Sequence, residues 1–180
     1  MSTKYTTAYR LAVGILCLGF LLDTASTLAA GTDMLVFDLN PLVRKLHSGG
    51  YIAWSLLRLV VALGLLTACW PSSLTMRNGV RRWHRLAAIL LPFSYRNAKA
   101  YAIPFAITAI GPLKAVSAAA NFYLLCTGHL LTSSIATMGL GILAGILTSN
   151  GVLLLHYRVT SQSMLRDGGP AESRTVRAGP

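Results

Sequence analysis

Three ionisable residues within apolar stretches are the side chains of this sequence best placed to do chemistry. Asp23 interrupts the apolar stretch FLLDTASTLAAG, and Arg58 and Lys114 interrupt two later stretches. A charge at the centre of a membrane-spanning helix costs roughly 2.5–3.5 kcal/mol on insertion scales. Because such groups normally face a partner or a polar cavity, each of the three marks a candidate site.

Asp23 and Arg58 lie at similar depths in consecutive apolar stretches. Asp23 is seven residues before Ala30, and Arg58 is seven residues after Tyr51. At 1.5 Å per residue, each lies about 10 Å from the outer end of its helix. Consecutive spans run antiparallel, so the sequence predicts a salt bridge between Asp23 and Arg58 that replaces two unpaired buried charges.

Other polar residues are expected near this pair. Thr27 shares the helix face of Asp23 and can orient its carboxylate, and Asn121 is expected at a similar depth. Lys114 lies near the middle of its span, too deep to reach either headgroup layer. Asp23 is the only acid within a span, so two cations compete for it, and the excess positive charge suits an anion or a neutral lysine. The alternative is a structural polar cluster that fixes helix register.

The composition indicates a membrane protein. Of the 180 residues, 54% are hydrophobic and 12% are charged, against roughly 25% charged in a typical soluble domain. The net charge is +11, but the basic residues lie between apolar stretches, which favours topology signals and anionic lipid over nucleic acid. Cys17, Cys69 and Cys126 lie within apolar stretches without metal-ligand spacing, so we expect no metal and no cofactor.

These stretches predict an all-α, four-helix transmembrane bundle. The spans are expected at about residues 9–30, 51–70, 101–127 and 133–157, each near the ~20 residues that cross a bilayer. They form an integral membrane domain of residues 1–159, and residues 160–180 are expected to be a mobile cytoplasmic tail. The basic loop between spans two and three places both termini in the cytoplasm of a multi-pass plasma-membrane protein. The alternative is that the first span is a cleaved signal peptide.

The first and second loops are each expected to contain a short interfacial helix. In the first, outer loop, Asn40 is a candidate N-cap and Pro41 suits the first helical position, with Asp38 just before them. In the second loop, Arg81, Arg82 and Arg85 share one side. They are expected to contact anionic lipid headgroups on the cytoplasmic side, each contributing about 1 kcal/mol.

Small residues recur every fourth position in the last span. Thr137, Gly141, Gly145 and Ser149 form this ladder, which lets another helix approach closely. The partner helix can belong to the same chain or to a second protomer, so the ladder leaves a homo-oligomer or a membrane partner protein open.

The first half of the chain resembles a group of small prokaryotic membrane proteins classified as a domain of unknown function. The resemblance lies in the D-x-x-x-T pattern of Asp23 and Thr27, in Asn40-Pro41 with Asp38 two residues earlier, and in Arg58 where the group usually has Lys. It covers about residues 11–70 and does not account for the second half. The resemblance implies a multi-span membrane protein with no known activity.

Two functional hypotheses follow from these residues. The first is a non-enzymatic helix-packing or accessory protein with an intramembrane Asp–Arg pair. The alternative is a small oligomeric transporter or channel with a polar path near Asp23, Arg58 and Lys114. An enzyme is not expected, because the sequence contains no HExxH, GxSxG or phosphate-binding glycine loop.

Overall fold

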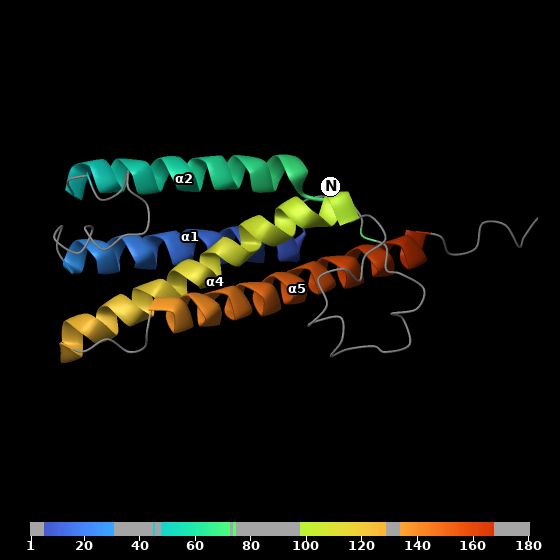
Figure 1. Ribbon diagram of the computed structural model, residues 1–180. Coiled ribbons are helices and arrows are strands. Elements are labelled where there is room, and N and C mark those ends of the chain that lie inside the picture. The colour runs from blue at the N-terminus through green and yellow to red at the C-terminus, as the bar shows by residue number, and fades with distance from the viewer. Residues whose placement is uncertain are drawn as a thin grey trace, which may run out of the picture.

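The described residues form a bundle of four long helices. The computed structural model describes residues 6–30, 45, 48–72, 74, 98–128 and 134–167. The helices are α1 (Thr7–Ala29), α2 (Ser48–Cys69), α4 (Ala98–Thr127) and α5 (Ser134–Asp167), and the described residues contain no strand. Successive helices run in opposite directions, so α1 and α4 begin at the same end of the bundle (Figure 1). We call this the proximal end and the opposite one the distal end.

The predicted all-α, four-helix class is confirmed. Each helix contains a segment long and apolar enough to cross a membrane: Thr7–Ala29, Gly49–Cys69, Tyr101–Thr127 and Ile135–Ser161. The interfacial helices predicted for the two loops lie outside the described residues, together with Asp38, Asn40, Pro41, Arg81, Arg82 and Arg85.

Large apolar side chains cover the outside of the bundle. Leu21 of α1 is 66% exposed, Val60 of α2 is 65% exposed, and Ile135 of α5 is 84% exposed. On a soluble protein such a surface would be an aggregation liability. Within a bilayer it is the surface that faces lipid. Lipid offers no hydrogen-bond partners, and the backbone needs none there, because each helix satisfies its own backbone hydrogen bonds.

Helix α5 extends further than its hydropathy predicts. It continues to Asp167, so the prediction that a mobile tail starts at residue 160 is wrong for residues 160–167. Thr160 is buried, and its hydroxyl donates a 2.9 Å hydrogen bond to the carbonyl of His156 one turn earlier. This bond within the helix satisfies the hydroxyl of a buried polar side chain.

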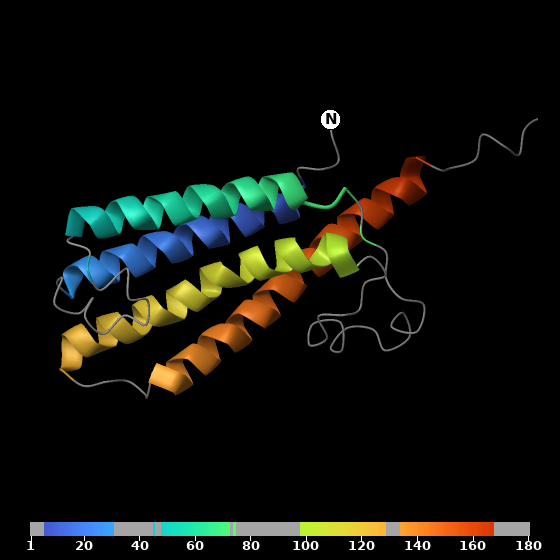
Figure 2. The same ribbon diagram turned by 45° about the horizontal axis from the view of Figure 1, so that its top comes forward.

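Two glycines let α1 and α4 cross at close range. A Cβ atom on Gly111 of α4 would lie 2.6 Å from the carbonyl oxygen of Ile15, and one on Gly19 of α1 would collide with the backbone of Gly111. Only glycine fits at such a backbone contact. The two helices are inclined to one another in the view of Figure 1 and lie side by side in that of Figure 2.

The small-residue ladder of α5 packs against α4 of the same chain. A Cβ atom on Gly145 would lie 2.8 Å from the carbonyl oxygen of Ala109, and one on Gly141 would lie 2.5 Å from the Cδ1 of Leu113. Further along the ladder Ser149 is fully buried, whereas Thr137 is partly exposed. The sequence left open whether the ladder packs against the same chain or against a second protomer. At Gly141 and Gly145 the partner is α4 of the same chain.

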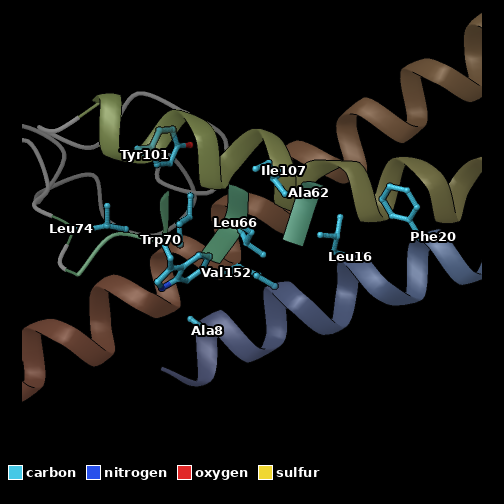
Figure 3. Packing of buried hydrophobic residues seen from close by; sticks show 12 residues of the cluster. Ala8, Leu16, Phe20, Ala62, Leu66, Trp70, Leu74, Tyr101, Ile107 and Val152 are labelled. Carbon is cyan, nitrogen blue, oxygen red and sulfur yellow. The ribbon is translucent and has the colours of Figure 1, made fainter. Parts of the chain in front are cut away.

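The apolar core is thickest at the proximal end. Trp70 at the end of α2 packs among Ala8, Leu66 and Val152, as Figure 3 shows. The edge of its indole meets the ring of Tyr9, with a centroid distance of 5.4 Å. This core joins all four described helices, with Tyr101 and Ile107 from α4, and a cavity remains between α2 and α4.

Candidate functional site

The glycine crossing determines which buried charges meet. Asp23 lies four residues after Gly19, and Lys114 lies three residues after Gly111. Because α1 and α4 run in the same direction, both residues lie one turn beyond the crossing on the distal side. The ammonium of Lys114 forms an ion pair with the Oδ2 of Asp23, and the two side chains are only 14% and 10% exposed.

The predicted salt bridge between Asp23 and Arg58 is wrong. Counting from the span ends placed Arg58 at the wrong level, because Asp23 lies level with the part of α2 that contains Tyr51 and Ser55, and Arg58 lies further along the helix. Between α1 and α2 the facing residues are Thr24 and Ser55, whose hydroxyl oxygens are 2.6 Å apart. Lys114 can reach the carboxylate from the middle of its span because α4 is inclined to α1 (Figure 1) and its four-carbon stem is flexible.

Tyr51 connects α2 to this ion pair. Its hydroxyl lies 3.3 Å from the Oδ2 of Asp23 and 3.4 Å from the Oγ1 of Thr27. A phenol carries one hydrogen, so it donates to one of these oxygens at a time. Tyr51 therefore links Thr27 to the carboxylate of Asp23. In the sequence, Tyr51 marks only the start of an apolar stretch.

Ser26 links the pair to the distal half of α4. Its hydroxyl donates to the carbonyl of Asp23 at 3.0 Å and accepts a 3.3 Å hydrogen bond from the Nδ2 of Asn121. Ser26 is fully buried, so these bonds satisfy a hydroxyl that would otherwise be costly to bury. Asp23, Thr27, Lys114 and Asn121 therefore belong to one polar cluster, completed by Ser26 and Tyr51.

Lys114 has a second favourable contact. Its ammonium lies 4.7 Å from the centroid of the Phe20 ring, within the range of a cation–π interaction. The carboxylate and the aromatic face together compensate for removing this ammonium from water.

Arg58 belongs to a different environment, which we call the α2–α4 groove. Its guanidinium carbon lies 5.6 Å from the centroid of the Trp54 ring, one helical turn earlier on the same face. The Nε of Arg58 and the Nε1 of Trp54 are buried without a hydrogen-bond partner in the described part of the chain. Both residues line a cavity of about 480 Å³, together with Phe20, Lys114 and the apolar side chains Leu57, Val61, Ala62, Leu65, Ile107 and Ile110.

A second polar contact set lies at the proximal end. His156 of α5 is fully buried, its Nε2 is 2.8 Å from the carbonyl oxygen of Pro71, and its Nδ1 is 3.0 Å from the hydroxyl of Thr6. A carbonyl only accepts, so Nε2 carries the hydrogen, and in the neutral ring Nδ1 accepts from Thr6. His156 therefore ties α5 to the start of α1 and to the end of α2.

The described residues hold no group of three or more His, Cys, Asp or Glu side chains that could bind a metal ion. Nor do the described cysteines pair with one another: Cys17, Cys69 and Cys126 are all free thiols.

The fold and these buried charges define the class of protein. It is a multi-pass integral membrane protein built as a four-helix bundle, with each helix long and apolar enough to span a bilayer. Comparison with protein-family models, curated proteins and solved structures finds no match to this chain. Its function is therefore argued from the site alone.

Proposed function

We propose that this protein is a non-enzymatic membrane protein that binds an anionic, largely apolar ligand in the α2–α4 groove. One observation carries the proposal: Arg58 lines an apolar cavity with its Nε buried and unpartnered in the described structure. Arg58 lies ten residues after Ser48 and eleven before Cys69, at the middle of α2. A cation held there is expensive unless an anion or a polar cavity compensates for it.

The charge balance of the site favours an anion. Lys114 neutralises Asp23, which leaves the charge of Arg58 without an acid among the described membrane-embedded residues. An arginine stays protonated even when buried, so it cannot relieve this cost by losing its proton. A bound anion would compensate the charge and would also accept hydrogen bonds from the guanidinium.

The non-enzymatic part of the proposal is supported by how the polar groups are used. Asp23, Lys114 and Tyr51 bind one another across three helices, which is the behaviour of a packing cluster. An accessory role is compatible with this arrangement, since ligand binding and partner binding can coexist. Transport along a polar path has weaker support, because most side chains lining the cavity are apolar.

The location and topology remain part of the proposal. A plasma-membrane protein with both termini in the cytoplasm follows from the basic second loop. The resemblance to the group of unknown function supports a multi-span protein and adds no activity.

Native mass spectrometry of the protein purified in mild detergent tests this function. We expect the wild type to retain anionic adducts and Arg58→Leu to lose them. Arg10→Leu is the matched control, because Arg10 is an exposed cation on α1 and its loss changes the net charge equally. Equal adducts on the wild type and on Arg58→Leu would refute the proposal.

A further inference from the structure

We infer that the ligand of the α2–α4 groove is a single-chain amphiphile with one carboxylate head, of the long-chain fatty acid type. This inference rests on the proposed binding of an anion by Arg58 and specifies the chemical class of that anion. Three features of the groove carry it: its net charge, its volume and the order of its lining residues.

The net charge of the groove favours a monoanion. Lys114 is already paired with Asp23, so Arg58 alone contributes an uncompensated charge to the cavity wall. A carboxylate carries one negative charge, whereas a phosphate monoester carries about 1.5 to 2 near neutral pH. A monoester would therefore leave excess negative charge in an apolar site.

The unpartnered donors fit a carboxylate. Arg58 and Trp54 lie four residues apart on one helix face, and each has a buried N–H group without a partner in the described structure. A guanidinium binds a carboxylate through two parallel hydrogen bonds. The indole N–H is a further donor on the same cavity wall, and it satisfies part of the carboxylate's remaining acceptor capacity.

The volume fits one hydrocarbon chain. The cavity measures about 480 Å³ and is open along its α2 rim, so it is a groove that covers one hydrocarbon chain from the side. A two-chain phospholipid would have one of its chains outside the groove.

The lining residues are ordered like the ligand itself. Along antiparallel α2 and α4, the polar lining residues Trp54, Arg58 and Lys114 lie toward the distal end of the groove, and Leu65 and Ile107 lie toward its proximal end. The seven residues from Arg58 to Leu65 span about 10 Å. A carboxylate at Arg58 would therefore place the first part of its chain along α2 toward the proximal end, and a longer chain would continue into the bilayer.

The groove is accessible from the bilayer. The α2 residues along its rim are about half exposed: Leu57 at 54%, Val61 at 52% and Leu65 at 48%. These side chains belong to the lipid-facing surface, so an amphiphile dissolved in the membrane can enter sideways without crossing water. The ligand is therefore taken from the bilayer rather than from solution.

Photocrosslinking in nanodiscs of phosphatidylcholine tests this inference. The probe is palmitate carrying a diazirine on its chain, used at mildly alkaline pH with mapping of labelled peptides. Unlabelled palmitate, hexadecanol and phosphatidylglycerol serve as competitors. We expect labelling on the α2 and α4 residues of the groove, strong competition by palmitate, and little competition by hexadecanol or phosphatidylglycerol.

Variants separate the head group from the cavity. Arg58→Leu is expected to weaken binding about 10-fold or more, because it removes a charge-assisted pair, whereas Arg10→Leu should bind as the wild type does. Val61→Trp, which fills the groove and leaves Arg58 in place, should also lower labelling. Circular dichroism and size-exclusion chromatography of each variant establish that it is folded.

The outcomes distinguish this inference from the proposed function. If phosphatidylglycerol competes and palmitate does not, the carboxylate inference fails and anion binding by Arg58 stands. If hexadecanol competes as well as palmitate, the head-group argument fails. If Arg58→Leu alters the binding of neither anion, both the inference and the proposed function are refuted.

Discussion

A double-mutant cycle on Asp23 and Lys114 tests the arrangement of the buried charges. Removing either partner of a buried ion pair leaves an uncompensated charge, which typically costs about 3–5 kcal/mol. Here the side chains are only 14% and 10% exposed, so we expect Asp23→Asn and Lys114→Met each to lower the free energy of unfolding by that amount. The double variant, which leaves no charge, should lie within about 1 kcal/mol of the wild type.

The same cycle distinguishes Lys114 from Arg58. The coupling free energy between positions 23 and 114 should be about 5 kcal/mol or more, because each single variant costs at least about 3 kcal/mol and the double variant at most about 1 kcal/mol. The cycle between Asp23→Asn and Arg58→Met should give a coupling smaller by at least about 1 kcal/mol, since the two groups belong to different contact sets.

The assay is unfolding in mixed micelles, with dodecyl sulfate titrated into a mild detergent and helicity followed by circular dichroism. Each variant is measured for reversibility so that the free energies refer to equilibrium. Additive effects of Asp23→Asn and Lys114→Met, or a larger coupling with Arg58, would refute the reasoning.

Three further predictions use the same unfolding assay. Gly111→Ala should destabilise the bundle by about 1–3 kcal/mol, whereas Gly64→Ala, with nothing within 4 Å, should be neutral or stabilising; equal effects would contradict the close crossing. His156→Phe should cost about 1–3 kcal/mol because it leaves the carbonyl of Pro71 without its donor, and unchanged stability would contradict that contact. Tyr51→Phe should cost about 1 kcal/mol through the lost hydrogen bond; a cost like that of Asp23→Asn would contradict a supporting role.

The four helices were predictable because they depend on a local property. An apolar stretch of about 20 residues is enough to identify a span, and the ends found by hydropathy agree with the helices within a few residues except at the C-terminal end of α5. That helix continues to Asp167, and the hydroxyls of Thr160 and Ser161 donate to carbonyls within it. Average hydropathy does not register these bonds.

The partner of Asp23 was not predictable from depth, because counting from span ends does not fix how far two helices are shifted along one another, and Tyr51 rather than Arg58 lies beside Asp23. The sequence nevertheless contains the information in its glycines. Gly19 precedes Asp23 by four residues, and Gly111 precedes Lys114 by three, so two parallel helices that cross at these glycines bring the charges together. The small-residue ladder of α5 indicates the contact between α5 and α4, which does not include Asp23 on α1.

Asp23 pairs with Lys114 rather than with Arg58, and this difference changes what the site can do. A lysine suits a fixed internal pair, because its compact ammonium on a flexible stem can reach the carboxylate of Asp23 and lie beside the ring of Phe20. An arginine suits an exchangeable ligand, because its planar fork binds a carboxylate in one defined geometry and keeps its charge in an apolar site. If Arg58 were paired with Asp23, the unpaired cation at the groove would be Lys114, which can lose its charge. With Lys114 in that role, the permanent charge faces the cavity, and the hydrocarbon wall beside it selects the kind of anion.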